Sequence, residues 1–464
     1  MKDITDKVIV MFGCGAVTKS LLHLLNNFFI INPKKLIIID LIDYRNHPVV
    51  KPYIEKGATY CVCDINKIYK ETIKKMNPYD LIIDLSCKTN SLGIIKYCKM
   101  YNIHYINTSI ESNRPIDENR NNDDDDLYNQ SYLSAHNEVL RINKLYPDKN
   151  ATAMVTYGFN PGMITTMIME GILFMAKNHP KSDELDLYIK NKSWGQLCRY
   201  LNIVTIHCSE TDSSELFDKT LHGDKFINTW CVHAFLQEYN EFCEFGYGSD
   251  QNTIPKDSEF LNESIISLQR PAKGIYCESY VPGEGNSIIG VCIPHSEAIS
   301  GSYVFSDPSH GHRVTMHYAY KFSPASFRSI KNYENKCEDK CKKAHVINNL
   351  DDKFYGVDKV GALILTKDKA LWIGSILDNK NVGYANGTVQ QVSASMLACL
   401  TYMLEKPNKG IIFPEQIDNH EYVLNLAKPY LGQFFCDFVD YKPKSLQFND
   451  MLRTKEQFDA QYII

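Results

Sequence analysis

Short, strongly apolar stretches alternate with amphipathic ones from the N-terminus to residue 110. The apolar stretches have the length and the Val/Ile/Leu content of buried β-strands. Between them, residues 16–29 and 90–101 place apolar side chains at helical spacing. Strands this apolar, separated by helices, predict a parallel sheet that is covered on both faces. The predicted strands are residues 7–13, 35–40, 58–63, 80–86 and 104–110.

The pattern changes further along the chain. Residues 151–162 predict one more strand with a turn, and a long Met-rich helix follows. From about residue 200 to 375, apolar stretches lie closer together and Gly and Pro separate them, which is typical of an antiparallel sheet. Helical spacing returns in residues 386–406 and 422–435. The strands predicted in the middle region are residues 203–210, 273–281, 286–294 and 313–320.

These patterns predict an α/β protein with three parts. Residues 1–160 form a Rossmann dinucleotide-binding domain, and residues 161–380 form an inserted α+β domain with a mostly antiparallel sheet. The inserted domain binds the substrate and mediates dimerisation in this interpretation. Residues 381–464 return as C-terminal helices that pack on the Rossmann domain.

Composition narrows the function. A net charge of −5 gives no broad attraction for nucleic acids or anionic membranes, and it suits a small cationic substrate. The N-terminus does not look like a secretory signal, and no apolar run reaches the roughly 20 residues that cross a bilayer. The 15 cysteines are scattered through apolar segments, which indicates reduced thiols. We therefore expect a cytoplasmic protein.

Two segments invite a metal interpretation that their spacing does not support. Cys337, Cys341 and His345 share a helical stripe, but a fourth ligand for zinc is missing. The acidic stretch 118–130 lacks the spaced ligands and the glycine of a calcium loop, so we interpret it as a solvated loop. The expectation is that the protein has no metal site.

A nucleotide-binding turn is predicted where the first strand meets the first helix. Gly13 permits the tight turn, and Gly15 lets a pyrophosphate approach the N–H groups at the helix N-terminus. Thr18 stands where the fingerprint has a third glycine. Asp40 ends the next strand, where an acid binds both ribose hydroxyls and repels a 2′-phosphate. The pattern favours NAD over NADP, although a structural turn that binds no phosphate is the alternative.

Further side chains are candidates for the same cofactor site. Ser86 and Thr89 end the fourth strand and either line the far side of the cofactor or cap their own loop. The remaining candidates are Ala16, Val17, Thr108, Asn160 and Pro161.

The segments after residue 104 carry a recurring order of motifs. "INTWCV" with Asn228, Thr229 and Trp230, "HSEAIS" beginning at His295, and the helix 386–410 are the most specific of them. With the Rossmann start, they resemble NAD-dependent homospermidine synthase of the bacterial type, a family with a saccharopine-dehydrogenase-like architecture. The resemblance runs from about residue 7 to residue 435.

The resemblance implies a transferase without net redox change. NAD takes a hydride from putrescine to give an imine, the amine of a second putrescine attacks, ammonia leaves, and the same NADH reduces the new imine to homospermidine. Spermidine is an alternative aminobutyl donor in that family. The resemblance also implies that the protein is a homodimer and that it binds putrescine and other small polyamines.

Roles of individual residues follow from the resemblance. Putrescine is a dication with a thin apolar stem, so it needs carboxylates and an aromatic face, and a cation over an indole contributes roughly 0.5–2 kcal/mol. Trp230 would supply that face and Glu210 and Glu238 would hold the ammonium ends. The resemblance also implies that Glu111 and Asn160 orient the diamine and that His295 removes a proton from the attacking amine. Glu297 would orient His295 or bind the second amine, and Asp358 is a less specific member of the site.

Alternatives stay open at this point. A single Trp in a strand is often core, and single Glu residues usually face water. Lys88 stands where the family carries an acid that helps to bind an ammonium end. A saccharopine- or carboxynorspermidine-type dehydrogenase would need an arginine for substrate carboxylates, and only Arg313 lies near these motifs. A non-catalytic NAD-binding protein is the remaining alternative, and the preferred donor and acceptor stay undetermined.

Overall fold

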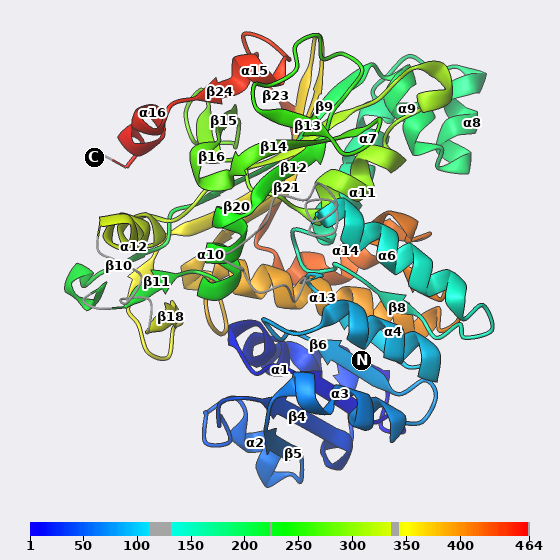
Figure 1. Ribbon diagram of the computed structural model, residues 1–464, viewed down its shortest axis with the longest axis vertical. Coiled ribbons are helices and arrows are strands. Elements are labelled where there is room, and N and C mark those ends of the chain that lie inside the picture. Colours follow the sequence, from blue (N-terminus) through cyan, green and yellow to red (C-terminus); the bar gives the residue numbers. More distant parts are fainter. Residues whose placement is uncertain (111–130, 223–224, 336–342, 463–464) are drawn as a thin grey trace, which may run out of the picture. The chain divides into compact units, whose positions relative to one another are not determined.

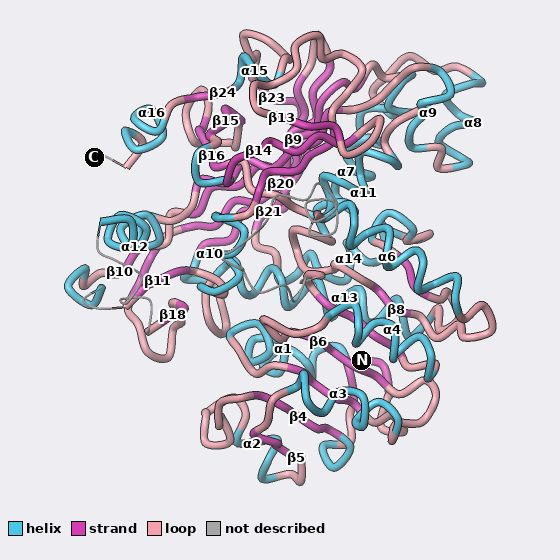
Figure 2. The backbone as a smooth tube through the Cα atoms, viewed as in Figure 1, coloured by secondary structure: helices cyan, strands magenta, loops and turns pink. Residues whose placement is uncertain are grey.

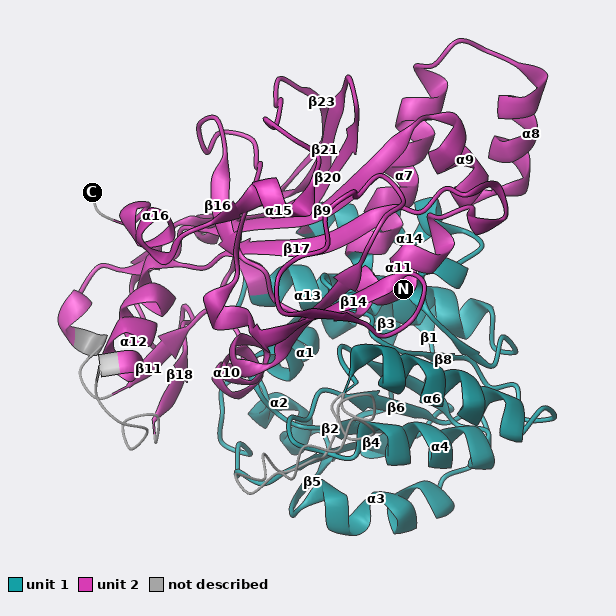
Figure 3. Ribbon diagram, turned by 45° about the horizontal axis from the view of Figure 1, so that its top comes forward, with its two compact units in different colours: residues 1–163, 383–385, 389–430 teal, residues 164–382, 386–388, 431–464 magenta. Residues whose placement is uncertain are grey.

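The computed structural model describes residues 1–110, 131–222, 225–335 and 343–462, and it divides into two compact units (Figure 3). The first unit comprises residues 1–163, 383–385 and 389–430. The second comprises residues 164–382, 386–388 and 431–464. The α/β class predicted from the sequence is confirmed, because the first unit has a Rossmann sheet and the second has an additional mixed sheet.

The first unit is built on a parallel sheet of seven strands in the order β22-β8-β7-β6-β2-β4-β5. From β2 the chain adds β4 and β5 on one side of the sheet and then β6 and β7 on the other. A doubly wound sheet binds its ligand at such a switch point, outside the carboxyl ends of the two central strands, here β2 and β6. The strands are β2 (Ile9–Phe12), β4 (Leu36–Asp40), β5 (Thr59–Val62), β6 (Leu81–Asp84), β7 (His104–Asn107), β8 (Ala153–Met154) and β22 (Ile411–Ile412). A short parallel pair joins β1 (Lys2–Asp3) to β3 (Phe29–Ile30).

Helices pack on this sheet because burying their apolar stripes against its apolar strands is favourable. Side chains of α3, α4 and α6 share one core with strand residues such as Phe12 and Tyr105. Figure 1 labels these three helices beside the strands of the unit. Elsewhere in the unit, Ser20 of α1 and Ser393 of α13 join their hydroxyls at 2.7 Å. The helices are α1 (Ala16–Phe28), α2 (Lys51–Glu55), α3 (Ile65–Lys74), α4 (Ser91–Tyr101), α6 (Tyr132–Leu145), α13 (Gly387–Glu405) and α14 (His420–Ala427).

The second unit is built on a large sheet whose main path is β13-β14-β12-β17-β9-β20-β21-β23, with β15, β16 and β24 attached (Figure 2). The sheet is mostly antiparallel, as expected, and the pair formed by β17 and β9 at its centre is parallel. About a hundred residues separate β9 from β17 in the sequence, and a connection of this length permits the parallel direction. The path strands are β13 (Ser258–Phe260), β14 (Ile265–Pro271), β12 (Phe242–Gly246), β17 (Thr315–Lys321), β9 (Ile203–Asp212), β20 (Val357–Thr366), β21 (Ala370–Asp378) and β23 (Gln433–Val439).

Smaller elements complete the second unit. The attached strands are β15 (Tyr276–Ser279), β16 (Ile288–Val291) and β24 (Leu452–Arg453). Two separate pairs are β10 (Glu215–Leu216) with β19 (Phe354–Tyr355), and β11 (Phe226–Asn228) with β18 (Ala344–Val346). The helices are α7 (Met163–Lys177), α8 (Asp183–Asn191), α9 (Trp194–Tyr200), α10 (Val232–Asn240), α11 (Ser296–Val304), α12 (Pro324–Asn335), α15 (Phe448–Met451) and α16 (Lys455–Ala460). None of the helices in the described part of the chain has the length and apolarity to span a membrane.

The C-terminal region departs from the expected helical return. The helix predicted at residues 422–435 ends at Ala427, because Pro429 has no N–H to continue it. Gly432 then turns the chain with a φ of +69°, and β23 follows and pairs with β21. Residues 431–464 therefore belong to the second unit and not to a helical cap on the first.

Candidate active site

The first strand of the first unit ends in the predicted nucleotide-binding turn. Gly13 has a φ of +84°, and a Cβ there would lie 2.6 Å from the carbonyl oxygen of Leu85, so only glycine fits. Gly15 precedes α1, and a Cβ added to it would have no atom within 4 Å. Ala16 and Val17 open the helix. The open space beside Gly15 and the helix N-terminus are the features that a pyrophosphate requires.

Thr18 and Asp40 support this turn. The Thr18 hydroxyl donates to the carbonyl oxygen of Gly13 at 2.9 Å, so the residue that replaces a third glycine braces the turn from inside. Asp40 Oδ2 accepts the N–H of Cys14 at 2.5 Å, and Oδ1 accepts the N–H of Ile42 at 2.7 Å. These bonds fix the carboxylate at the carboxyl end of β4, beside the glycine turn.

The loop after β6 is organised around a buried acid. Ser86 Oγ donates to Asp84 Oδ1 and lies 2.9 Å from Thr89 Oγ1, and Tyr105 donates to Asp84 Oδ2 at 2.9 Å. Burial raises the pKa of Asp84 above its ordinary value. The Ser86 and Thr89 hydroxyls therefore have a local capping role, which was one of the two interpretations of this segment.

Four other residues of the first unit that the sequence singled out lie in loops. Lys88 is exposed in the same loop as Ser86, with a φ of +61°, and its carbonyl oxygen accepts from Asn66 Nδ2 at 3.0 Å. Thr108 follows β7. Asn160 and Pro161 are joined by a cis peptide bond in the segment before α7.

In the second unit, alternate residues of three neighbouring strands give the sheet one acidic face. The register pairs Glu210 of β9 with Tyr320 of β17, and it pairs Asp212 of β9 with Asp358 of β20. All four side chains are buried. Because side chains of a strand alternate between faces, Glu210 and Asp212 point to the same side. We call this the acid face, formed by Glu210, Asp212, Tyr318, Tyr320 and Asp358.

Hydrogen bonds hold the carboxylates of the acid face. The Tyr318 hydroxyl donates to Glu210 Oε2, and the Thr388 hydroxyl donates to Asp358 Oδ2 at 2.6 Å. Burial, together with Glu210 and Asp212, raises the pKa of Asp358 well above its ordinary value. Burial likewise raises the pKa of Asp212. A raised pKa favours the protonated form of each carboxyl group, and protonation reduces the repulsion within the acid face.

His295 stands at the N-terminus of α11, and this helix lies on the acid face, where Gly301 packs against Met316. His295 Nδ1 lies 2.7 Å from Glu297 Oε2, and Nε2 lies 3.8 Å from Glu238 Oε2. Its ring centroid is 4.9 Å from that of Tyr318. The structure therefore brings together four residues that were predicted from the sequence: Glu210, Glu238, His295 and Glu297.

The surroundings of His295 shift its pKa away from that of a free histidine. Burial lowers its pKa, but the carboxylates of Glu297, Glu238 and Glu210 raise it more, to about 9. His295 is therefore an imidazolium at neutral pH. Its position among three carboxylates, which no local sequence pattern reveals, is the cause.

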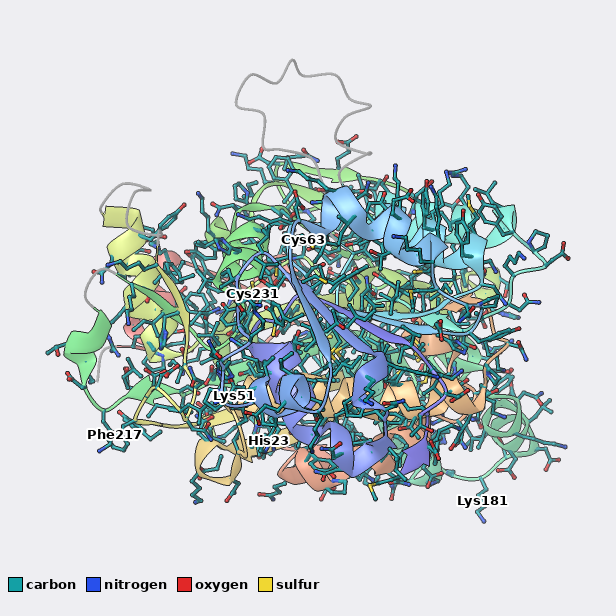
Figure 4. All side chains as sticks on the ribbon, turned by 90° about the horizontal axis from the view of Figure 1, so that it is seen from below. His23, Lys51, Cys63, Lys181, Phe217 and Cys231 are labelled. Atoms are coloured by element: carbon teal, nitrogen blue, oxygen red, sulfur yellow. The ribbon has the colours of Figure 1, made fainter. Side chains whose placement is uncertain are left out.

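Trp230 lies in the connection between β11 and α10, so it is not a strand residue, and it is half-buried. Its indole N–H donates to the Tyr320 oxygen at 3.1 Å, and its ring meets that of Phe235 edge-on, with centroids 5.6 Å apart. Asn228 Nδ2 donates to its carbonyl oxygen at 3.1 Å. Figure 4 labels the following residue, Cys231. The hydrogen bond to Tyr320 joins Trp230 to the acid face.

Four members of this site were missed from the sequence: Asp212, Tyr318, Tyr320 and Thr388. A usable signal existed for Asp212, which is two residues from Glu210 on one strand and so shares its face. The alternation in "MHYAYK" places Tyr318 and Tyr320 on one face in the same way. No local pattern indicates Thr388, because its bond to Asp358 depends on tertiary structure.

Several sequence candidates lie elsewhere. Glu111 is outside the described residues, as are Cys337, Cys341 and the stretch 118–130. His345 lies on β18, not on a helix, with Nε2 2.7 Å from Asp352 Oδ2. In the described ranges, no group of three or more His, Cys, Asp or Glu residues is placed to hold a metal ion. Arg313 donates to the exposed Glu263 at 2.9 Å.

Comparisons with known proteins give the same picture. Residues 9–154 match the family described as saccharopine dehydrogenase NADP binding domain. The chain is 25% identical to homospermidine synthase of Mesorhizobium japonicum over 94% of its length and 91% of that protein. It is 26% identical to homospermidine synthase of Blastochloris viridis over 94% of its length and 92% of that protein.

A solved structure agrees with these matches. The crystal structure of a homospermidine synthase from Legionella pneumophila in complex with NAD superimposes with a TM-score of 0.82 and 27% identity, and it covers 97% of this chain and 98% of its own. The resemblance predicted from the motifs is confirmed: over nearly its whole length, this chain resembles the homospermidine synthases.

Proposed function

We propose that the protein is a homospermidine synthase, a transferase that moves an aminobutyl group from putrescine to a second putrescine. Two curated homospermidine synthases, each matched over 94% of this chain, support an enzyme of this type. The structural observation that carries the proposal is the acid face of the second unit, with Glu238, Glu297 and His295 beside it.

The acid face suits a cationic substrate. Among the described residues of the second unit, Glu210, Asp212, Glu297 and Asp358 are buried, whereas no lysine or arginine is. Burying several carboxylates together is unfavourable unless hydrogen bonds, protonation or a cation compensates them. Tyr318 and Thr388 supply hydrogen bonds. The His295 imidazolium is one positive charge beside several carboxyl groups, and an ammonium group would supply a further one.

Trp230 adds an aromatic surface to this charge. Its ring is held at the edge of the acid face by Tyr320 and is only half-buried. A diamine whose stem crosses the indole and whose ammonium groups meet Glu210 and Glu238 would use both features. Putrescine and related small polyamines have this shape.

The turn at Gly13 and Gly15 fits NAD. The open space beside Gly15 supports a pyrophosphate contact there, and the Asp40 carboxylate, held by two backbone N–H groups at the end of β4, supports a contact with ribose hydroxyls. When bound, NAD supplies a reversible hydride acceptor. We propose that Gly13, Gly15, Ala16, Val17 and Asp40 hold it.

The charge state of His295 gives it a specific role in ammonia release. Because it is protonated at neutral pH, it can donate a proton to the amino group that leaves as ammonia. Once it has lost that proton, the neutral ring can accept one from an incoming ammonium. Glu297, which holds Nδ1, keeps the ring oriented in both states.

We also propose that the enzyme is cytoplasmic and dimeric. The cysteines of the described chain are present as free thiols, in keeping with a reducing cytoplasm. We propose a homodimer, and light scattering at micromolar concentration tests its mass.

One incubation tests the proposed function. The protein is mixed with putrescine and a catalytic amount of NAD, and polyamines, ammonia and NADH are quantified. We expect homospermidine and ammonia in equal amounts without accumulation of NADH. Stoichiometric NADH without a triamine would instead indicate a dehydrogenase and overturn the proposal.

A further inference from the structure

The aromatic ring of Trp230 is fixed through a residue that no sequence pattern singled out. Its indole N–H donates to the hydroxyl oxygen of Tyr320 at 3.1 Å. The indole ring also contacts the ring of Phe235, and the two ring planes are perpendicular. The edge-on contact tolerates sliding of the ring, whereas the directional hydrogen bond does not.

Tyr320 is itself rigidly held. It is buried on β17, at the centre of the sheet, where the register pairs it with Glu210. Its ring stacks on that of Tyr318 at 6.0 Å with an interplanar angle of 13°, and it meets Phe322 at 5.8 Å and 70°. The hydroxyl oxygen is therefore a fixed point to which the indole is tied.

The backbone around Trp230 is fixed separately from its ring. Asn228 Nδ2 bonds to the carbonyl oxygen of Trp230, and Asn386 Nδ2 bonds to the carbonyl oxygen of Thr229 at 2.7 Å. These bonds hold the main chain but leave the side-chain torsions free. Loss of the Tyr320 hydroxyl would therefore release the ring without releasing the segment that carries it.

We infer that Tyr320 is a positioning residue that sets the plane of the Trp230 ring over the acid face through this one hydrogen bond. The inference rests on the proposed function, because it assigns the ring a cationic substrate. Tyr320 touches the indole and has no chemical step of its own. Tyr318, its stacking partner, holds Glu210 in the same way, so adjacent rings of one strand align the aromatic and the acidic contact of the substrate.

The ring position can be tested without turnover. The protein has three tryptophans, so 5-fluorotryptophan labelling gives three fluorine resonances, and Trp230→Phe assigns the one of interest. We expect Tyr320→Phe to shift or broaden only that resonance. Tyr276→Phe is the matched control, because Tyr276 is also a buried strand tyrosine of the second unit and donates to the carbonyl oxygen of Lys273. It should leave the resonance unchanged.

Kinetics test whether the ring position matters. We expect Tyr320→Phe to lower kcat/KM for putrescine about tenfold, a typical effect of one lost hydrogen bond. Thermal stability should match that of Tyr276→Phe, and NAD affinity should match that of the wild type. In a Trp230→Phe background, which lacks the indole N–H, the same substitution should change kcat/KM less than about twofold.

The outcomes are separable. An unmoved fluorine resonance, an unchanged kcat/KM, or an equal loss in the Trp230→Phe background would each overturn the positioning role. A wild-type protein that forms no homospermidine would instead overturn the proposed function, while the fluorine spectrum would still decide whether Tyr320 holds the ring.

Discussion

Replacing Glu297 by glutamine should change the acid strength of His295. Glu297 Oε2 lies 2.7 Å from His295 Nδ1 and contributes the strongest of the interactions that raise its pKa to about 9. An opposite charge at this distance raises a pKa by about 1–3. Glu297→Gln keeps the size of the side chain and removes the charge. We therefore expect the His295 pKa to fall to between about 6 and 8.

Histidine NMR gives the measurement. The ring signal of His295 is the one that disappears in His295→Gln, and its titration is followed in the wild type and in Glu297→Gln. Glu263→Gln is the control, because Glu263 is exposed and pairs with Arg313. The basic limb of the pH profile for homospermidine formation should move to lower pH in Glu297→Gln only. A wild-type His295 that titrates near 6.5, or an identical pKa in both proteins, would refute the reasoning.

The same pKa predicts how stability depends on pH. The folded-state pKa of His295 is raised from 6.5 to about 9, so its contribution to folding is fully present below pH 6.5 and is lost as the pH rises through 9. At 1.36 kcal/mol for each pH unit, the loss is about 3 kcal/mol. Urea unfolding should show it in the wild type and not in His295→Gln. His104→Gln is the control, because burial lowers the His104 pKa to about 4, outside this window.

Substitutions at Trp230, Glu210 and Asp40 test other parts of the site. Trp230→Ala should retain a near-normal thermal midpoint because the Trp230 ring is only half-buried. It should lose most homospermidine formation in a chromatographic assay, with Trp230→Phe in between. Trp372 lies in the core, so the control Trp372→Ala should lower the free energy of unfolding by about 3–5 kcal/mol. Glu210→Gln should raise the KM for putrescine at least tenfold, and unchanged kinetics would remove it from the site. Asp40→Asn should weaken NAD binding and reduce the preference for NAD over NADP in a fluorescence titration, and an unchanged ratio would exclude Asp40 from the ribose site.

The first unit could be predicted well because its signals are local. Strands β2 and β6 are buried along their whole length, so residues 7–13 and 80–86 predict them without tertiary information, and α1 and α4 follow from their helical spacing. Gly13 and Asp40 follow from their places at strand ends. The Ser86 and Thr89 hydroxyls were ambiguous, because only the structure places the buried Asp84 between them and Tyr105.

The second unit was predicted less completely because its site depends on pairing between distant segments. The sequence marks β9 and β17 as strands but gives no direction for their pairing, and their parallel register is what sets Tyr320 beside Glu210. Glu297, which raises the pKa of His295 most, is two residues away in the sequence, whereas Glu238 and Glu210, which also raise it, approach from other elements. Residues 431–439 were misassigned because "YLGQFF" continues an apolar pattern past the proline that ends the helix.

The pleat of the sheet resolves an apparent conflict in the local sequence. Lys321 follows Tyr320, and Lys359 follows Asp358, so a cation stands next to each site residue along the chain. Both lysines point to the opposite face, where their ammonium groups lie 3.9 and 2.7 Å from the carboxylate of Glu284. A slip of one residue in β20 would exchange Asp358 for Lys359 and put a positive charge into the acid face. Glu284 favours the native register by pairing both lysines, and this keeps the acid face available for a cationic substrate.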